Sequence, residues 1–572
     1  MSAFSKPSLL LTHNGYALIA AFLGIALTVS SCTAWYFYQK VTREWELNLS
    51  LLGHPRGVKF KQTVVICGGS IAGLISARVC ADHFQNVVIV DPEITKAGQE
   101  FAKKRVAQYD SLHAYLTFMV DGLRRLWPNL DPMIEQAGGV FRPGDFKLNF
   151  GGIPLLAAQS SYPTTIKTAA GFEKTNGLPD TMLIRRPKFE AVLYRLLIDS
   201  SANSIQTIQG TVTGLVPSDD MSDIRSVNIR TNEGEEKTVK DVALVIDCTG
   251  STQAGIKWLK SAGFISSPES SSDNKRGPDN LRISYDHKLR YVTVTFDNLG
   301  DLVHTLPIPG GFEKAGFIYT YYAHCKWGNE GFVLTRMDNT IQLCCGGWGD
   351  VHLPKEKEDI LPYVRSVKGA YPAPQWVRKV VEMLLESEQK GDAVITFKPL
   401  KIPAPSFVQY HKITHLLPSN FIAIGDSEMQ LNPLFAQGCS KALFSAMTLN
   451  TVLHNRVASN SPNQIPKDFS TLYFQRSHNT LEDIWSVFKK STKAIDYGYP
   501  TTIPIKEESR DREGAAVRWY AYHAARAAER DEVVASALWH VRMLATPQAE
   551  LFRPRVIFGV LRWAVMNAIS QT

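Results

Sequence analysis

Two short runs of β-branched residues flank a glycine-rich turn and a helical pattern between Thr63 and Asp91. Residues 63–67 and 87–90 have the uninterrupted apolar character of buried parallel strands, and the apolar positions of residues 74–84 follow helical spacing. This order predicts a strand, turn, helix and strand unit whose helix N-terminus faces a phosphate group.

The turn between the first strand and the helix has the small residues that a dinucleotide needs. Gly68 permits a sharp turn, Gly69 and Ser70 let the backbone approach a pyrophosphate, and Gly73 lets helix and strand pack closely. Asp91 follows the second strand and is placed to bind the ribose hydroxyls of an adenosine. The alternative is an ordinary glycine-rich turn of an α/β domain.

Helical patterns continue after this unit. Apolar positions from Leu112 to Leu126 have helical spacing, and Arg105 and Gln108 come just before them. Another amphipathic helix opens at Arg186 and Pro187, and residues 205–230 are rich in strand-forming residues.

Two later strands end in polar residues. Residues 242–246 form an apolar run that ends in Asp247, which is either a cap for the next turn or a neighbour of a cofactor. Residues 421–424 form a second such run, Gly425 and Asp426 end it, and a helix is predicted to begin near residue 436. These turns predict a second ligand-binding edge far along the chain from the first.

Residues 281–349 change to alternating segments rich in aromatic and β-branched residues, which predict antiparallel strands. A sheet inserted into a dinucleotide fold would form a wall for a substrate. Its aromatic residues either line that wall or pack in the core: Tyr319, Tyr321, Tyr322 and Trp348. No catalytic acid or base is assigned, although His324, Tyr321 and Tyr322 lie on the predicted substrate sheet.

The stretch from residue 15 to residue 38 has no charged side chain and ends in four aromatic residues. As a helix it would measure roughly 36 Å, which is enough to cross a bilayer. We expect a single membrane anchor with the catalytic part in the cytosol, since more basic residues follow the stretch than precede it. A cleaved signal peptide is the alternative.

The 572-residue chain has globular composition, with 44% hydrophobic and 20% charged residues. Its net charge of +8 is not concentrated in a basic stripe, so no nucleic-acid partner is predicted. The eight cysteines lack metal-ligand spacing and no metal site is expected.

Near the C-terminus an apolar stripe around Val556, Val560 and Val565 predicts a helix that docks on the domain or lies on a membrane surface.

From residue 60 onward the chain resembles the flavoprotein monooxygenases of the para-hydroxybenzoate hydroxylase fold. Within them it is similar to the squalene epoxidase-like and geranylgeranyl reductase-like branch, as a fungal-type, membrane-anchored member. The resemblance is carried by G-G-S-I-A-G-L from residue 68 with Asp91, R-V-A-Q from 105 with His113, R-R-P-K-F-E from 185, D-C-T-G-S-T from 247 and G-D-S-E-M-Q-L-N-P-L-F-A-Q-G from 425.

The resemblance implies an α/β fold: a Rossmann-like FAD-binding domain with an inserted antiparallel sheet for the substrate, a C-terminal helical region and one N-terminal transmembrane helix. The corresponding ranges are a tail at 1–14, an anchor at 15–38, a linker at 39–61, FAD-binding parts at 62–150, 181–265 and 401–455, substrate-domain parts at 151–180 and 266–400, and a helical region at 456–572.

It also implies a set of FAD contacts. The pyrophosphate would lie on Gly68, Gly69, Ser70, Ala72 and Gly73, and the adenosine ribose on Asp91. Asp426 would bind the ribityl chain, and Arg186 with Arg105 or Gln108 its phosphate side. The flavin ring would face the backbone of Gln437, Gly438 and Cys439, with Asp247 near the cofactor.

The implied reaction is hydroxylation or epoxidation of a lipophilic small molecule, such as a polyketide or terpenoid, by dioxygen through a flavin hydroperoxide. NADPH or NADH would reduce the FAD. Because Asp247-Cys248-Thr249-Gly250 replaces the family's Asp-Gly motif, a separate reductase is an alternative donor. The anchored protein is expected at a membrane such as the endoplasmic reticulum.

Two departures from the family pattern stand at Met429 and Ala436, where the family has histidine and glycine. The W-x-W-x-I-P motif of flavin-dependent halogenases does not occur in the sequence, which sets halogenation aside. A flavin-dependent dehydrogenase or alkene reductase would use the same FAD motifs, and a non-catalytic FAD-binding scaffold is a further alternative.

Overall fold

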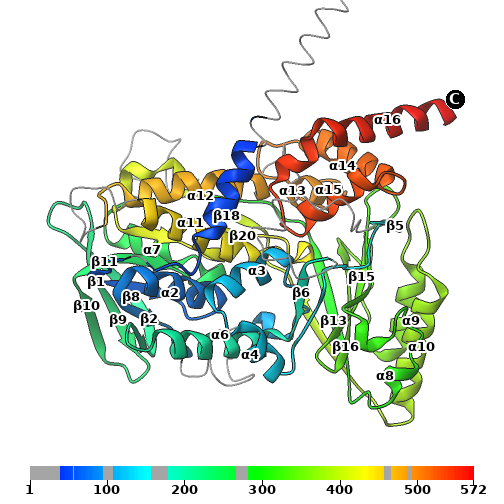
Figure 1. Cartoon of the computed structure of the whole chain (residues 1–572), viewed down its shortest axis with the longest axis horizontal. Helices are drawn as coiled ribbons and strands as arrows, with labels where there is room; N and C mark the ends of the chain where they lie inside the picture. The colour runs from blue at the N-terminus through cyan, green and yellow to red at the C-terminus, as the bar shows by residue number, and fades with distance from the viewer. Residues whose placement is uncertain are drawn as a thin grey trace, which may run out of the picture.

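A parallel sheet of five strands forms the centre of the predicted dinucleotide unit (Figure 1). The computed structural model describes residue 36 and residues 39–55, 57–94, 107–155, 178–265, 281–455, 465–485 and 492–571. The sheet has the order β19-β11-β1-β2-β7, with β1 Phe60–Cys67, β2 Phe84–Val90, β7 Ile205–Ile208, β11 Val242–Asp247 and β19 Phe421–Ala423. All its neighbours pair in parallel, as their apolar runs predict.

Helices cover this sheet and bring distant segments together. The predicted first helix is α2, Ile71–His83, and it packs against helices from two later parts of the chain, α6 Arg186–Ser201 and α11 Gly438–Asn455. Its small and branched residues are buried over nearly its whole length because neighbours lie on several sides. The remaining helices of this domain are α3 Thr117–Leu126, α4 Leu130–Gln136, α7 Ala254–Ser261 and α12 Phe469–Trp485.

Three small sheets complete the domain built around the parallel sheet, which is called the FAD-type domain below because it contains the motifs predicted to bind FAD. The strand-rich segment after β7 forms an antiparallel sheet of β8 Gly210–Pro217, β9 Ile224–Thr231 and β10 Glu236–Lys240. The other two sheets join β3 Val140–Pro143 with β6 Asp180–Leu183, and β12 Arg282–Ser284 with β18 Ser406–Val408 and β20 Met429–Gln430.

The predicted inserted sheet is present and has seven strands. Its order is β17-β13-β16-β15-β14-β4-β5, with β13 Leu289–Asp297, β14 Phe317–Tyr322, β15 Glu330–Met337, β16 Thr340–Trp348 and β17 Val394–Lys401. The short strands β4 Leu148–Phe150 and β5 Ile153–Pro154 extend it from an earlier part of the chain, and β4 pairs with β14 in parallel. The other described pairs are antiparallel, which confirms the alternating pattern.

The two faces of this sheet pack against different parts of the molecule. Tyr319 and Tyr321 belong to a core shared with α9 Lys357–Ser366 and α10 Gln375–Gln389, which together with α8 Leu302–Thr305 flank the sheet at the right of Figure 1. Tyr322 and Trp348 instead pack in the core of the FAD-type domain. Because successive strand residues point to opposite faces, the predicted aromatic wall is divided between two cores.

The C-terminal region is helical, as predicted. It consists of α13 Thr492–Asp496, α14 Ala515–Ala528, α15 Glu532–Arg542 and α16 Pro554–Gln571. Val556 and Val560 of α16 are fully buried against α14 and α15, so one face of the last helix docks on its own domain. Leu561 and Val565 of the predicted stripe are exposed on the helix.

The predicted anchor at residues 15–38 lies, apart from Tyr36, outside the described residues. Within the part of the chain that the structure describes, no helix has both the length and the apolar character needed to span a membrane. The predicted linker at 39–61 contains a helix over residues 39–50, and Leu49 on it is buried in the FAD-type domain. Arg476 of α12 pairs with Glu44 at 2.5 Å, which fixes this helix further.

A buried carboxylate joins the three parts of the structure. Asp496 of α13 accepts hydrogen bonds from Tyr285 Oη at 2.7 Å, Trp348 Nε1 at 2.8 Å and Asn432 Nδ2 at 2.8 Å. These donors come from the small sheet, the inserted sheet and the turn before α11. Burial raises the pKa of the Asp496 carboxyl to about 7, although the three donors act against that rise.

This buried acid predicts a pH dependence of stability. The folded carboxyl holds its proton up to about pH 7, whereas the unfolded one loses it near pH 4, so rising pH favours the unfolded chain between these values. In Asp496→Asn the amide keeps acceptor and donor positions for all three partners, and the slope of up to about 1.4 kcal/mol per pH unit is lost. Urea unfolding from pH 4.5 to 8 measures the difference.

Asp350→Asn is the matched control, because that side chain is 98% exposed. Parallel pH profiles for wild type and Asp496→Asn would contradict the assignment.

Candidate functional site

The predicted phosphate-binding turn holds Asp91 directly beneath it. The Gly69 amide donates to Asp91 Oδ2 at 2.9 Å, and the Glu93 amide donates to Oδ1 at 2.8 Å. The carboxylate is therefore fixed at the end of β2, beside the N-terminus of α2. This is the place that the sequence predicts for a residue that binds a ribose.

Gly68 and Gly73 are required by close backbone contacts. A Cβ on Gly73 would lie 1.8 Å from the Gly68 carbonyl oxygen, and a Cβ on Gly68 would lie 2.3 Å from that of Cys248. Gly68 also has a φ of 121°, which side chains rarely allow. The contact with Cys248 places the first turn against the turn that follows β11.

Ser70 is held by residues of α6. The Ser70 hydroxyl donates to Glu190 Oε2 at 2.8 Å, and Arg186 Nη2 donates to Ser70 Oγ at 3.4 Å. Glu190 is fully buried, and Tyr109, whose hydroxyl bonds to it, has a raised pKa from burial and from that carboxylate. In the sequence, Glu190 is only one residue of the R-R-P-K-F-E motif. Its contact with Ser70 depends on the fold, which brings α6 against α2.

His113 is the second partner of Arg186. Arg186 Nη1 donates to His113 Nε2 at 3.3 Å, and Nδ1 of the ring lies 3.0 Å from the Ser111 carbonyl oxygen. Because arginine only donates, Nε2 accepts and the ring proton lies on Nδ1. Burial, with the Arg186 charge, lowers the pKa of His113 to about 3. The imidazole is therefore neutral and leaves the positive charge on Arg186.

Asp247 acts as a structural cap, which is one of the two roles that the sequence leaves open for it, and its proximity to a cofactor stays a prediction. Its carboxylate is fully buried and accepts from the Thr249 amide at 2.9 Å, the Gly255 amide at 2.8 Å, the Thr249 hydroxyl at 2.7 Å and the Ser427 hydroxyl at 3.0 Å. A buried carboxylate needs such bonds to replace water, and these use both oxygens. Asp247 thus ties the turn after β11 to the turn after β19.

Asp426 pairs with a lysine that the sequence did not single out. Lys441 Nζ lies 2.6 Å from Asp426 Oδ1 and also donates to the Met429 carbonyl oxygen. The lysine side chain is fully buried, whereas that of Asp426 is 35% exposed. Since Lys441 lies on the first turn of α11, it holds the predicted ribityl-binding carboxylate against that helix.

The two predicted motifs meet in space. Gly425 packs so closely on α2 that a Cβ there would lie 3.0 Å from Cβ of Ala72. Cys439, on the first turn of α11, is near enough to Arg186 and Asp426 for their charges to influence its thiol, whose pKa burial raises. The N-termini of α2 and α11 therefore converge around Arg186, as the flavin hypothesis requires.

The convergence leaves room and polar groups for a cofactor. A Cβ added to Gly438, the first residue of α11, would meet no atom within 4 Å. Arg186 Nε and Ser440 Oγ are buried, and neither has a hydrogen-bond partner within the described residues. Unsatisfied buried donors of this kind are expected where a ligand supplies the missing acceptors.

Three further residues are predicted to contact FAD: Gln108, Gln437 and Arg105. Gln108 lies on a short 3-10 helix, Ala107–Asp110, next to Tyr109 and so near Glu190. Gln437 is half-buried in the turn before α11. Arg105 lies outside the described residues, and its role stays a prediction.

Comparison with solved structures identifies the fold. A flavoprotein/dehydrogenase from Cytophaga hutchinsonii is similar over 89% of this chain and all of its own, with 12% identity and a TM-score of 0.51. A triple mutant of the flavin-dependent brominase Bmp2 is similar over 88% of this chain and 99% of its own, with 12% identity and a TM-score of 0.50. The chain has the fold of these flavoproteins. No protein-family model matches the sequence, and no curated protein matches it.

These likenesses confirm the predicted α/β architecture, in which a central parallel sheet is joined by an inserted sheet of mainly antiparallel strands. The narrower placement in the squalene epoxidase-like or geranylgeranyl reductase-like branch stays a prediction.

The turn between β20 and α11, which would face the flavin ring, is held by the C-terminal region. Arg542 of α15 donates to the Phe435 carbonyl oxygen at 2.9 Å and to Tyr322 Oη at 3.2 Å, and Tyr322 Oη donates to the Leu434 carbonyl oxygen. With the Asn432 bond to Asp496, the turn is tied at both ends. Neither Arg542 nor Asp496 belongs to a motif, so this role could not be predicted from the sequence.

A small apolar cavity lies between this turn and the inner face of the inserted sheet. It is lined by Tyr321, Tyr322, Ala323, Gly331, Phe332, Val333, Cys344, Gly346, Trp348 and Leu434. The sequence places three candidate side chains on the predicted substrate sheet: Tyr321, Tyr322 and His324. Tyr322 faces the turn, whereas Tyr321 donates to the Tyr371 carbonyl oxygen at 3.3 Å on the opposite face of the sheet. His324 packs between Phe150, Trp327 and Tyr522, so its role is packing.

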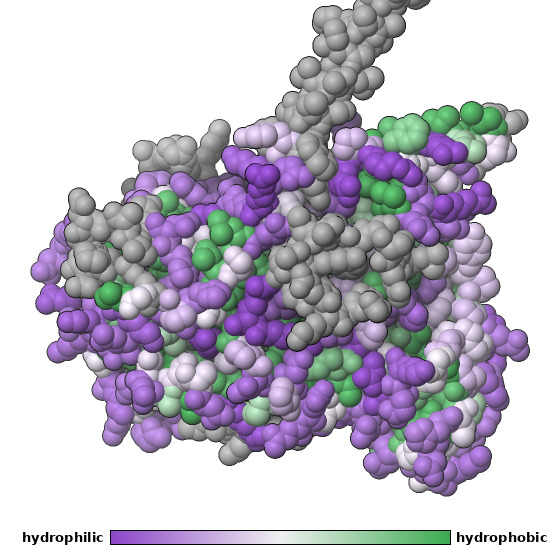
Figure 2. Space-filling view, in the orientation of Figure 1, coloured by the Kyte–Doolittle hydropathy of each residue, from purple (hydrophilic) through white to green (hydrophobic). Residues whose placement is uncertain are grey.

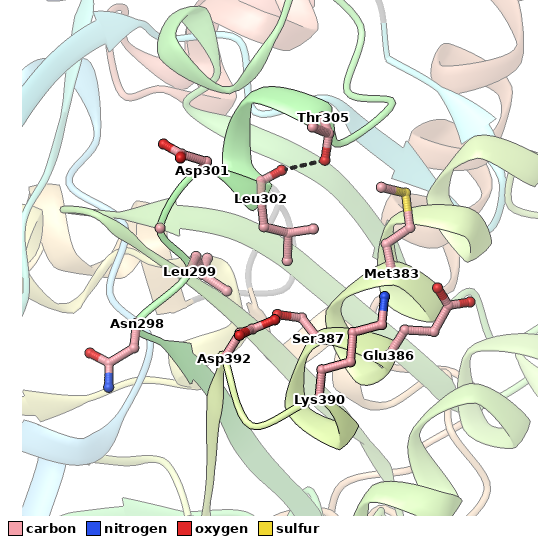
Figure 3. A pocket seen from close by; sticks show the side chains of 11 residues that line it. Asn298, Leu299, Asp301, Leu302, Thr305, Met383, Glu386, Ser387, Lys390 and Asp392 are labelled. Carbon is pink, nitrogen blue, oxygen red and sulfur yellow. Dashed lines mark hydrogen bonds between the residues drawn. The ribbon is translucent and has the colours of Figure 1, made fainter.

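A separate cleft of about 680 Å³ lies between the loop after β13 and the end of α10 (Figure 3). It is lined by Asn298, Leu299, Gly300, Asp301, Leu302, Thr305, Met383, Glu386, Ser387, Lys390 and Asp392. None of these residues belongs to the converging motifs, and the cleft is therefore distinct from the candidate cofactor site.

The pairing of Asp426 with Lys441 predicts a non-additive pair of substitutions. Asp426→Asn leaves a buried ammonium without its carboxylate and should cost about 1–3 kcal/mol of unfolding free energy. Adding Lys441→Met removes that charge, so the double variant should be more stable than Asp426→Asn alone. Urea unfolding followed by tryptophan fluorescence, with and without FAD, measures both.

Glu388→Gln is the control for this pair, since its partner Lys357 is 38% exposed and the change should cost less than about 1 kcal/mol. A double variant no more stable than Asp426→Asn would contradict the pairing.

Proposed function

We propose that this protein is an FAD-dependent oxidoreductase, and specifically a monooxygenase that hydroxylates or epoxidises a lipophilic small molecule. The observation that carries the proposal is the convergence of two helix N-termini, those of α2 and α11, around Arg186. Each motif alone is compatible with other nucleotide sites. Together they match two parts of a flavin dinucleotide, its central diphosphate and its flavin ring.

The residues present suit successive parts of FAD. The Gly68–Gly73 turn would receive the pyrophosphate, Asp91 the adenosine ribose, and Asp426 the ribityl chain. The start of α11 would face the flavin ring, where a helix N-terminus contributes about half a positive charge and stabilises an anionic ring without a side-chain cation. Bound FAD would supply the redox and oxygen chemistry, with NADPH or NADH as the proposed donor and dioxygen as the co-substrate.

The protein would orient the substrate and exclude water. The small cavity beside the Leu434 turn is lined mostly by apolar and aromatic residues of β14, β15 and β16. This apolar wall favours a lipophilic substrate over a small charged one, whereas the cavity itself, at about 10 Å³, has only the size of a water molecule. Tyr322 Oη is already engaged with Leu434 and Arg542, which fits a role in holding the turn rather than in moving a proton.

Two further elements of the proposal come from the sequence. The charge-free stretch at 15–38 is proposed as a membrane anchor with the enzyme on the cytosolic side, at a membrane such as the endoplasmic reticulum. A separate reductase is the alternative to direct reduction of the FAD by NADPH.

A dehydrogenase or alkene reductase is the second candidate function. The likeness to a protein described as a flavoprotein/dehydrogenase favours this candidate.

Arg186 should contribute to FAD affinity. Its guanidinium lies beside Ser70, at the N-terminus of α2, and has an unsatisfied buried Nε. Losing a charged hydrogen bond to a phosphate costs about 1.5–3 kcal/mol, so Arg186→Met should weaken FAD binding about 10- to 100-fold. Fluorescence titration of the deflavinated protein measures this, with the exposed Arg195→Met on the same helix as control. Equal affinities in the two variants would refute the placement.

The reaction class is tested with labelled dioxygen. The purified yellow protein, NADPH and a library of terpenoids and prenylated aromatics are incubated under ¹⁸O₂, and products are analysed by mass spectrometry. A monooxygenase gives products heavier by one ¹⁸O atom. Oxidised or reduced products without label would establish the dehydrogenase or reductase alternative. A protein that takes up no FAD would contradict both the monooxygenase and this alternative.

A further inference from the structure

The last helix, α16, has apolar side chains on two opposite faces. On the inner face, Val556 and Val560 are fully buried, and Gly559 is so close to α15 that a Cβ would lie 2.7 Å from Cγ2 of Val534. This face accounts for the docking of α16 on the domain. Docking therefore requires no apolar residue on the opposite face.

The outer face nevertheless presents a continuous apolar stripe to solvent. Phe558 is 60% exposed, Leu561 47%, Val565 57% and Ile569 69%, and their spacing of three or four residues places them in one row along the helix. Figure 2 shows this helix as the green ridge at the upper right of a mainly purple surface. Soluble proteins rarely expose an uninterrupted apolar row of this kind without a partner for it.

The residues around the stripe are those of a lipid interface. Within α16 the charged residues are Arg555 and Arg562, and there is no acidic residue. Trp519 on the adjoining helix α14 is 47% exposed, and Phe552, just before α16, is 40% exposed. Tryptophan with arginine beside an apolar helix face is typical of the headgroup region of a bilayer.

The position of the N-terminal helix favours a bilayer over a protein partner. The helix over residues 39–50 lies along the same upper edge of the molecule as α16 (Figure 1). The 24 residues before it, 15–38, carry no charge and have the length to cross a bilayer. A membrane that accommodates that stretch would therefore lie next to the edge on which the stripe of α16 is exposed.

We propose that α16 lies flat in a membrane surface, with its outer stripe among the acyl chains and Arg562 at anionic headgroups, while Arg555 pairs with Asp531 at 2.9 Å within the protein. The helix would then form a second attachment that fixes the orientation of the enzyme on the bilayer. This surface involves no cofactor residue, so its test is independent of the proposed oxygenation.

Hydrogen exchange of the full-length chain tests the proposal helix by helix. With vesicles of phosphatidylcholine and phosphatidylserine, peptides within residues 558–571 should exchange about tenfold more slowly than without vesicles. Residues 232–235, an exposed turn between β9 and β10, should be unchanged. Omitting phosphatidylserine should reduce the protection, because Arg562 loses its anionic partners.

Two variants make the test specific. Leu561→Glu/Val565→Glu places two charges on the stripe and should abolish the protection of 558–571 while peptides of α15 keep wild-type exchange. Val394→Glu, at an apolar site 47% exposed on the edge strand β17, should retain it. Protection that persists in the double variant would overturn the proposal. So would protection that needs no vesicles and rises with protein concentration, which would indicate a second copy of the chain as the partner.

Discussion

The site depends on one buried carboxylate at the end of a central strand. Asp247 terminates β11, which lies between β1 and β19, and its oxygens accept bonds from the following turn, from the start of α7 and from Ser427. A carboxylate buried so fully needs hydrogen-bond donors from the protein itself. Here these bonds draw together the turn after β11, the start of α7 and the turn after β19. The carboxylate therefore ties the turn after β11, against which Gly68 packs, to the polar turn at Asp426.

Close backbone packing then sets the distance between these turns. Gly68 lies against Cys248, Gly73 against Gly68, and Gly425 against Ala72. With these contacts in place, the N-termini of α2 and α11 open toward the same region, and Arg186 with neutral His113 adds one positive charge there. The arrangement concentrates amide dipoles and a guanidinium where the proposed dinucleotide would carry its negative charge.

The regions outside the FAD-type domain support the same site. Asp496 and Arg542, both from C-terminal helices, hold the two ends of the turn before α11, while Tyr322 reaches the turn from the inserted sheet. The turn before α11 is thus bounded by all three parts of the molecule. A substitution in the C-terminal helices would reach the site through this turn, without touching a motif.

The sequence alone determined the elements that local spacing encodes. The strand-turn-helix unit with Asp91, the polar turn at Asp426 and the alternating strands of the inserted sheet all follow from periodicity and from glycines required by tight turns. These features depend on neighbouring residues, so the chain displays them directly.

Only the tertiary structure decided how distant polar side chains pair. It assigned Asp247 to capping, brought Lys441 to Asp426 and Glu190 to Ser70, and divided adjacent Tyr321 and Tyr322 between two cores. It also left one face of α16 uncovered. The physical reason is that burial and hydrogen-bond satisfaction are properties of the packed neighbourhood, which segments hundreds of residues apart create together.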